Sequence, residues 1–399
     1  MPVLPDIADG HADMIAWRQH IHSAPEVGFD LHQTAGFVAG LLRGFGCDRV
    51  EMAIGESGVV GVIHGNGDGP ALGLRADMDA LPIVEDTGHP HASRRAGQMH
   101  ACGHDGHTAM VLGAARHLCA TRHFAGSVVL IFQPAEEIGR GAAAMLDDGL
   151  LRRFPVSRIF GLHNWPGLAE GAVFCRPGPI MAAVADLTIR LAGRGGHGGM
   201  PHLASDQLLA AAQVIVAVQG IVARNMSALE AGVITIGHVI DTGAWNVMPT
   251  EVVLRGTVRW FAPDVGALLE HRIAEVAHAA AAAWGATCAV EFCRVTPAVV
   301  NDPVATREAE LAASEIVGQA AVALLPAPLM AGDDVGALMA AVPGCYLILG
   351  AGDDPGVAPL HHPRYDFNDA LLPLGASLLA RCVERGLMEG DHHTLAGWR

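Results

Sequence analysis

The apolar run Ala71–Arg75 (ALGLR) leads almost directly into two carboxylates, Asp77 and Asp79. Three further apolar runs of strand length also end in titratable residues: 127–133 (SVVLIFQ), 158–162 (RIFGL) and 344–352 (GCYLILGAG). Helix-like stretches occur at 108–120 and 369–385. Continuous apolar strands that alternate with helices are typical of a mostly parallel sheet covered on both faces. We therefore predict an α/β fold whose polar residues gather beyond the carboxyl ends of the strands, where such sheets place function.

The middle of the chain has a different pattern. Residues 184–193 (VADLTIRLAG) alternate apolar and polar side chains, which predicts a strand with one wet face. A long apolar helix follows, with Ser205 as its predicted N-cap. Further strand and helix patterns complete the order β-α-β-β-α-β, a split βαβ unit of the ferredoxin-like kind. We expect this unit to be inserted into the α/β domain, with the boundaries 1–182, 183–295 and 296–399.

Composition limits the classes of function and partner. A chain of 399 residues with 51% apolar residues is long enough for two folded domains. Its 25 Lys and Arg against 41 Asp and Glu give a net charge of −16. This balance argues against a nucleic acid or an anionic membrane as partner, because no excess of cations is present to neutralise phosphates. It does not identify a substrate.

Localisation is predicted from the apolar segments and the cysteines. The start of the chain carries Asp6, Asp9 and Asp13 where a secretion signal would be apolar. The apolar segment 208–223 is too short and too polar to span a bilayer comfortably. The eight cysteines are scattered without a tight framework, which favours thiols over disulfides. We predict a cytoplasmic protein.

The stretch 99–107 (MHACGHDGH) holds three histidines, an aspartate and a cysteine. Cys102 and His104 are two positions apart, so in an extended loop their side chains emerge on the same side. With Glu137 they offer a thiolate, an imidazole and a carboxylate, a ligand set suited to zinc or a similar divalent ion. A cysteine nucleophile with His104 or His107 as its base is the mechanistic alternative. Titratable residues after the other strands favour the metal site over this alternative and over chance clustering.

Eight motifs, in this order along the chain, carry a family resemblance: RADMDALP, MHACGHDGH, QPAEE, LHNWP, GRGGHGGMPH, GAWNVMP, GTVR and LHHPRYDFND. The set resembles the co-catalytic metallopeptidase family of aminoacylases and carboxypeptidase G. Within it, the set is most similar to the amidohydrolase branch that contains hippurate hydrolase and indole-3-acetyl-amino-acid hydrolases. The resemblance implies a catalytic α/β domain that holds two metals, with an inserted lid and dimerisation domain. It also implies metal-dependent cleavage of N-acyl amino acids to a carboxylic acid and a free amino acid.

The resemblance further implies a set of metal ligands. The matching positions are Cys102 as bridging ligand, Glu137 and His361 on one ion, and His104 and His163 on the other. Each ion would have the shared thiolate, two private ligands and a shared water, which is the coordination number typical of zinc. Two divalent ions per subunit are implied, either zinc or manganese. His361 is preferred to His362 because the family motif places its histidine directly after the apolar residue.

Three carboxylates near these ligands have roles of their own. Neighbouring side chains diverge on a chain that leaves a strand, so Glu137 can bind metal while Glu136 faces the substrate. Glu136 matches the family's general base, which takes a proton from the attacking water and hands it to the leaving amine. Asp79 resembles the carboxylate that orients the ligands. Asp77 is either a second such carboxylate or a strand-end cap.

The inserted unit carries three more matches. His197 corresponds to a histidine that, in the family, reaches the active site of the partner subunit and stabilises the developing oxyanion. Asn246 and Arg259 match positions that hold the substrate's α-carboxylate, an anion that a guanidinium binds well. The resemblance therefore implies a homodimer or a dimer-based oligomer.

One departure and two rival functions remain. Asp333, Asp334 and Val335 stand where the family usually has Glu-Asp-Phe, and we expect the smaller valine to widen the cavity or loosen the packing there. A dipeptidase or carboxypeptidase would use the same two-metal mechanism on another substrate. A non-enzymatic metal-binding or scaffold protein would need the ligands but not Glu136, so the intact Glu136 favours an enzyme.

Overall fold

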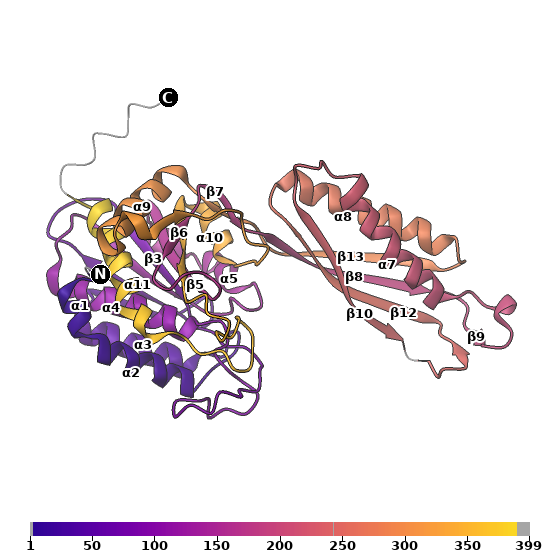
Figure 1. Cartoon of the computed structure of the whole chain (residues 1–399), viewed down its shortest axis with the longest axis horizontal. Coiled ribbons are helices and arrows are strands. Elements are labelled where there is room, and N and C mark those ends of the chain that lie inside the picture. The colour runs from indigo at the N-terminus through magenta and orange to yellow at the C-terminus, as the bar shows by residue number, and fades with distance from the viewer. Residues whose placement is uncertain (1–2, 242, 389–399) are drawn as a thin grey trace. The chain divides into compact units, whose positions relative to one another are not determined.

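The computed structural model describes residues 3–241 and 243–388 (Figure 1). Contacts divide the chain into two compact units: unit 2 comprises residues 181–298 and 329–332, and unit 1 comprises the rest of the described chain. The sequence-based boundaries fall within a few residues of the crossings near 180 and 298. The return of residues 329–332 to unit 2 has no counterpart in the prediction. It arises because the backbone N–H of Ala182 donates to the Leu329 carbonyl at 3.1 Å, a pairing that leaves no sequence pattern.

Unit 1 is built on an eight-stranded sheet in the order β1-β2-β4-β3-β5-β16-β6-β15. The block β4-β3-β5-β16 is parallel throughout, so the carboxyl ends of these four strands meet at one edge. The sheet is mostly parallel, as predicted, but β2 runs antiparallel to both β1 and β4, and β6 antiparallel to β16. The strands are β1 (Arg49–Ile54), β2 (Gly58–His64), β3 (Ala71–Asp77), β4 (Ser127–Gln133), β5 (Arg158–Trp165), β6 (Val173–Cys175), β15 (Val322–Leu324) and β16 (Gly344–Gly350).

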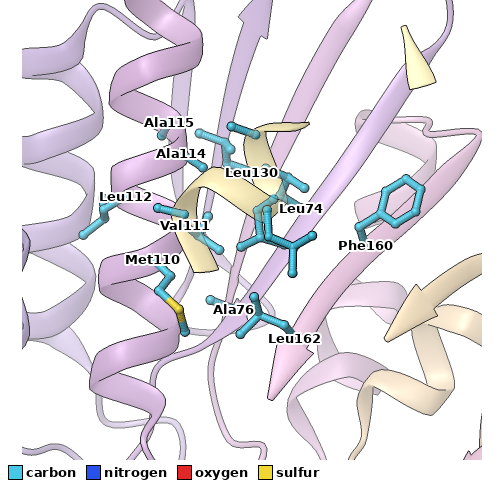
Figure 2. Close-up of a cluster of buried hydrophobic side chains, with 14 of the residues drawn as sticks. Leu74, Ala76, Met110, Val111, Leu112, Ala114, Ala115, Leu130, Phe160 and Leu162 are labelled. Carbon is cyan, nitrogen blue, oxygen red and sulfur yellow. The ribbon is translucent and has the colours of Figure 1, made fainter. Parts of the chain in front are cut away.

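Helix α4 (His104–Thr121) is the central helix of the unit 1 core. Figure 2 shows its Met110 and Val111 beside Leu74 and Ala76 of β3 and Leu162 of β5. The helix starts four residues before the predicted stretch, because its first turn is polar in sequence yet buried in the fold. The other helices of unit 1 are α1 (Pro5–Asp9), α2 (His11–Ser23), α3 (His32–Phe45), α5 (Gly141–Asp147), α6 (Leu150–Arg153), α9 (Pro303–Val317), α10 (Val335–Ala341) and α11 (Leu372–Gly386).

Unit 2 has the predicted order β-α-β-β-α-β around a four-stranded antiparallel sheet, β10-β12-β8-β13. Strand β8 alternates buried and less buried residues, as the sequence pattern predicts. Two helices pack with the sheet in one core. The elements are β8 (Ala183–Ala192), α7 (Gln207–Arg224), β10 (Gly232–Asp241), β12 (Glu251–Trp260), α8 (Pro263–Ala282) and β13 (Thr287–Thr296).

The N-cap of α7 is Asp206, so the prediction of Ser205 was wrong by one residue. The Asp206 side chain accepts a hydrogen bond from the Leu209 N–H at 2.9 Å. The Ser205 hydroxyl instead accepts from the Arg194 N–H at 2.8 Å and so ties the preceding loop together. Both residue types are good N-caps, and only the loop contact separates them.

Within the described part of the chain, α7 is the one helix long and apolar enough to cross a membrane by length and composition. Its Ala210, Val214, Val218 and Ile221 are buried in the unit 2 core against the sheet. Packing against the sheet therefore accounts for the apolar residues on this face of α7.

Two short ribbons complete the fold. In unit 2, β9 (Gly196–His197) pairs antiparallel with β11 (Val247–Met248). At the crossing between units, β7 (Gly178–Met181) pairs with β14 (Val299–Asn301). Because the chain leaves unit 1 through one of these last strands and returns through the other, its exit and re-entry points are neighbours.

Candidate active site

All five expected metal ligands lie in unit 1, at the edge where the parallel strands end. Strand β4 leads into Glu136 and Glu137, β5 carries His163 two residues before its end, and β16 leads into the loop that holds His361. Cys102 and His104 come from the start of α4. The edge therefore gathers side chains from segments more than 250 residues apart, which is what the strand-end pattern predicts for a parallel sheet.

The ligand atoms form two groups that share Cys102. In the first group, one ligand atom each of Cys102, His104 and His163 lies within 4.8 Å of the other two. The second group joins Cys102 with Glu137 and His361 under the same limit. The Cys102 Sγ is 3.5 Å from the His163 Nε2, and the His361 Nε2 is 3.5 Å from the Glu137 Oε2. A shared thiolate between two private pairs is an arrangement that can hold two ions.

Hydrogen bonds fix the tautomers of two histidines. The His104 Nδ1 donates to the Asp79 carbonyl at 2.8 Å, and the His163 Nδ1 donates to the Asn164 carbonyl at 2.7 Å. Since a carbonyl only accepts, each Nδ1 carries a proton, and Nε2 is the ring nitrogen left to face the site and to bind a metal. Metal-binding histidines are held in this way.

Two buried atoms at the site lack a hydrogen-bond partner within the described residues. They are the His104 Nε2 and the Glu137 Oε1. Burial, followed by the Glu137 carboxylate, raises the pKa of the Cys102 thiol well above its usual range. Burial also raises the pKa of Glu137 to about 7. Without a cation, the buried thiolate of Cys102 and the carboxylate of Glu137 would destabilise each other. A divalent cation would stabilise both charged forms, so this set of ligand atoms fits one.

Asp79 orients the glutamate pair through the backbone. Its Oδ1 accepts from the Glu136 N–H and its Oδ2 from the Glu137 N–H, both at 3.0 Å. The preceding Ala135 has φ 54°, a left-handed conformation that turns both N–H groups toward this carboxylate. His361 also has a left-handed φ, 64°, with its N–H donating to the Ala101 carbonyl at 2.7 Å. Such conformations are costly for residues other than glycine and gather at functional sites.

The neighbouring His362 has a different role. Its Nδ1 accepts from the Arg364 N–H at 3.1 Å and so closes a turn of the loop. His361, and not His362, belongs to the ligand group with Cys102 and Glu137.

His107 is hydrogen-bonded to two buried residues next to the ligands, a structural role that was not predicted for it. Its Nδ1 hydrogen bonds the Asp77 Oδ1 and its Nε2 the Asn164 Oδ1, both at 2.7 Å. The Asn164 Nδ2 donates in turn to the Tyr365 hydroxyl at 2.7 Å. Because both ring nitrogens of His107 are occupied, it is poorly placed to act as the base of a Cys102 nucleophile. Asp77 is a second supporting carboxylate rather than a strand-end cap.

Arg75 is a second residue that sequence reasoning missed. It is 2% exposed and forms buried ion pairs with Asp77, Asp333 and Asp334 at 2.6, 3.1 and 3.3 Å. The signal was present in the sequence, because a lone arginine in an otherwise apolar strand needs buried anions. The departure at Asp333 and Asp334 is therefore part of this network, and Val335 is fully buried at the start of α10.

Asp333 also bears on Glu136. Ligand atoms of Glu136, Asp333 and Asp334 lie within 4.8 Å of one another. Burial first and the Asp333 charge second raise the pKa of Glu136 well above its usual range. The Glu136 Oε2 is 3.8 Å from the His104 Nε2, so this carboxylate borders the first ligand group.

The remaining expected site residues lie in unit 2. His197 and Val247 are partners in the β9–β11 ribbon, and the Asn246 carbonyl accepts from the Gly198 N–H at 2.9 Å, so His197 and Asn246 are close. Both residues are exposed. Arg259 lies on β12, one of the two inner strands of the sheet, where its Nη1 donates to the Met330 carbonyl at 2.7 Å. In the described chain, no hydrogen bond or ion pair joins Arg259 to His197 or Asn246.

Known proteins resemble this chain over most of its length. Residues 73–385 match the family described as Peptidase family M20/M25/M40. The chain is 37% identical over 381 residues to hippurate hydrolase of Campylobacter jejuni, a match that covers 96% of this chain and 98% of the relative. It is 36% identical over 384 residues to N-acetyl-L-cysteine deacetylase of Bacillus subtilis, with coverage of 96% and 90%.

Among solved structures, the YxeP protein of Bacillus subtilis is described as a dinuclear metal-binding peptidase of the M20 family. It matches with a TM-score of 0.81 and 32% identity, covering 95% of this chain and 99% of that one.

Proposed function

Because this chain belongs to peptidase family M20/M25/M40, we propose that it is a metal-dependent amidohydrolase of N-acyl amino acids. It cleaves the amide bond and releases a carboxylic acid and a free amino acid. The substrate class is of the hippurate, N-acetyl or indole-3-acetyl type, in keeping with the relatives named hippurate hydrolase and N-acetyl-L-cysteine deacetylase. The observation that carries the proposal is the pair of ligand groups that share Cys102, with Glu136 at their border.

The proposed cofactor is two divalent ions per subunit, zinc or manganese. His104 and His163 would hold one ion, Glu137 and His361 would hold the other, and Cys102 would serve both. When bound, such ions lower the pKa of the attacking water and polarise the scissile carbonyl. The Nδ1 hydrogen bonds of His104 and His163, which turn Nε2 toward the site, and the unpartnered His104 Nε2 and Glu137 Oε1 support this assignment.

Glu136 is the proposed general base. Its carboxylate takes a proton from the attacking water and delivers it to the leaving amine, so the amide nitrogen departs as a neutral amine. The Asp79 carboxylate accepts a hydrogen bond from the Glu136 N–H, and this bond fixes the backbone from which the Glu136 side chain projects.

Unit 2 is proposed to supply substrate contacts. His197 stabilises the oxyanion, and Asn246 and Arg259 hold the α-carboxylate of the amino-acid part. In the family resemblance the histidine acts on the partner subunit, so we propose a homodimer or a dimer-based oligomer. A cytoplasmic location is proposed as well, supported by eight cysteines that are all free in the structure.

The test is amine release from hippurate, N-acetyl-methionine, indole-3-acetyl-alanine and a dipeptide. Each substrate is offered to the untreated enzyme, to chelated enzyme, and to chelated enzyme re-supplied with zinc or manganese. We expect turnover of at least one N-acyl amino acid that chelation abolishes and metal restores. Preference for the dipeptide would instead identify a dipeptidase or carboxypeptidase with the same mechanism. Turnover that survives removal of all bound metal would overturn the two-metal proposal.

A further inference from the structure

Two cysteines that are far apart in the sequence lie in contact at the edge of the unit 1 core. The Sγ atoms of Cys47 and Cys119 are 3.5 Å apart, and both thiols are free. Cys47 follows the end of α3 and is partly exposed, whereas Cys119 lies in the last turn of α4 and is 8% exposed. Neither residue belongs to the candidate active site. Some fifteen residues of α4 separate Cys119 from His104, which is about 22 Å at 1.5 Å per residue.

The backbone around Cys47 is fixed by the end of α3. Gly46 has the left-handed φ of 88° and its N–H donates to the Arg43 carbonyl at 3.1 Å. The Cys47 N–H donates to the Leu42 carbonyl, also at 3.1 Å. These two bonds form a Schellman motif, which places Cys47 at a defined position beyond the helix end.

Arg122 ties this turn to the end of α4. It caps α4 three residues after Cys119, and its guanidinium donates to the Gly46 carbonyl at 3.0 Å and to the Asp48 carboxylate at 2.8 Å. The residues on both sides of Cys47 are therefore held by a side chain from the same helix end as Cys119. The approach of the two sulfurs is built into the fold rather than left to flexible side chains.

The surroundings of the pair favour a thiolate. The hydrogen bond between the two thiols can run in either direction, so either sulfur can be the acceptor. The Arg122 guanidinium, which is bound to both neighbours of Cys47, adds a positive charge beside the pair. A thiolate is the reactive form in oxidation and disulfide exchange, and the second thiol can then resolve the oxidised sulfur.

We propose that Cys47 and Cys119 form a site of reversible oxidation, at which a peroxide converts the two thiols to an intramolecular disulfide. One of the two thiols, as its thiolate, attacks a peroxide oxygen, the O–O bond breaks, and a sulfenic acid forms while the departing hydroxide takes up a proton to become water. The sulfur of the other cysteine then attacks the sulfenic sulfur, its thiol proton and the sulfenic hydroxyl group leave together as a second water, and the S–S bond forms. The two thiols lose two electrons and hydrogen peroxide gains two.

The geometric demand of this reaction is small. The sulfurs must close from 3.5 Å to about 2.05 Å, a change that side-chain rotation and slight backbone movement can supply. A reducing thiol reverses the reaction by exchange through a mixed disulfide.

The experiment treats the native, reduced full-length protein with hydrogen peroxide, then alkylates it after denaturation and maps its peptides by mass spectrometry. We expect one cross-linked peptide pair, containing Cys47 and Cys119, and a fall of two in the number of alkylated cysteines. Dithiothreitol should restore both. Cys47→Ser and Cys119→Ser should each abolish the fall of two, whereas Cys293→Ser, which removes an exposed cysteine of unit 2, should not.

A second readout is the melting temperature. The cross-link closes a loop of roughly 70 residues in the unfolded chain, so oxidised wild-type protein should melt higher than reduced protein. Peroxide treatment should produce no such rise in Cys47→Ser. Sulfinic acid at either cysteine without a cross-link, disulfides only between molecules, or a cross-link to another cysteine would overturn the proposal. Peptide mapping of the wild type decides the matter even if a serine variant fails to fold.

Discussion

Glu136 and Glu137 are adjacent in sequence but differ in their contacts. Glu137 shares a ligand group with Cys102 and His361, whereas Glu136 borders the group that contains His104 and has a carboxylate oxygen within 4.8 Å of one of Asp333. We expect Glu136→Gln to keep the full metal content and to lose roughly 10²- to 10⁴-fold in kcat, the range of general-base catalysis. Glu137→Gln should lose metal as well as turnover. Metal analysis and kinetics on the same preparations separate the two roles, and a Glu136→Gln enzyme with near wild-type kcat would rule out the assigned base.

Asp79 acts on both glutamates without needing to touch the substrate. Removing its carboxylate by Asp79→Ala leaves the Glu136 and Glu137 N–H groups without their acceptor. Metal affinity should fall by about 10- to 100-fold, the usual effect of losing a residue that orients ligands. Titration of the apoprotein with zinc measures this, with Asp86→Ala, an exposed aspartate, as the matched control. Equal affinities in the two variants would mean that Asp79 does not orient the site.

At this scale the sequence predicts residues with a chemical motif and misses those that act through packing. The expected ligands could be assigned because thiolate, imidazole and carboxylate follow apolar strands in family order. The partner of His107 could not, since its contact with Asn164 joins segments that are 57 positions apart. Arg75 could have been flagged as a charge in an apolar strand, but its three acidic partners are set by the sheet and by the 333–334 turn.

Helix α4 depends on a glycine that separates two expected ligands. Gly103 has φ 93°, and a Cβ there would lie 2.4 Å from the Asn164 Oδ1 and 2.7 Å from the Tyr365 hydroxyl. Both groups are fixed by their own hydrogen bonds, so neither can move freely. Gly103→Ala should therefore lower the free energy of unfolding by about 1–3 kcal/mol and reduce metal content.

Urea unfolding and metal analysis check this prediction. Gly36→Ala in α3 is the control, because its Cβ would meet no heavy atom within 4 Å and its φ is not left-handed. We expect that change to be neutral or to stabilise by up to about 1 kcal/mol through helix propensity. If both substitutions behave alike, the crowding around Gly103 does not matter.

His117 joins three helices of unit 1 through its ring. Its Nδ1 lies 2.6 Å from the Asp6 carboxylate of α1 and its Nε2 lies 2.8 Å from the Glu384 carboxylate of α11. Burial alone would lower the pKa of His117, but the hydrogen bonds to Glu384 and Asp6 outweigh it and raise that pKa. The protonated ring can donate to both carboxylates.

The sign of the pH effect follows from this raised pKa. The stabilisation by His117 is fully present below the unfolded-state pKa of about 6.5 and is lost as the pH rises through the higher folded-state pKa. Compared with His117→Gln, the wild type should therefore have its largest advantage in free energy of unfolding near pH 6, and the advantage should shrink toward alkaline pH. Urea unfolding of both proteins at several pH values tests it. An advantage that is constant or grows with pH would contradict the assignment.

Elements were predicted well where hydrophobic periodicity is strong and poorly where side-chain chemistry decides. The strands that end at the site and the alternation in β8 follow from apolar runs. The beginning of α4 was placed too late, because its polar first turn is buried by the site rather than by core packing. The antiparallel pairing of β1 with β2 has no distinguishing pattern, since both orientations suit a buried edge of the sheet.

At the scale of the whole molecule, the residues expected to bind metal and those expected to bind substrate lie in different units. All five candidate ligands, Glu136 and Asp79 lie in unit 1, and His197, Asn246 and Arg259 lie in unit 2. Each unit has its own hydrophobic core. An inserted unit with its own core can be removed without opening the host core if its ends meet.

The ends of unit 2 do meet in register. Val184 of β8 and Thr296 of β13 are paired residues of neighbouring antiparallel strands, so their Cα atoms are only about 5 Å apart. Replacing residues 185–295 by a two-residue Asn-Gly turn should therefore give a protein that unfolds cooperatively and binds as much metal as the full chain. Its turnover of N-acyl amino acids should fall to background, because the residues proposed to bind the substrate carboxylate and the oxyanion are gone.

A full-length His197→Ala variant is the matched control, because it keeps both units and removes one of these contacts. It should bind metal normally, lose turnover by about 10²- to 10³-fold as expected for one oxyanion contact, and retain residual activity. Normal turnover in the shortened protein would mean that unit 2 contributes nothing to catalysis. Loss of metal there, with normal metal in His197→Ala, would mean instead that unit 1 needs unit 2 to hold its strand ends in place.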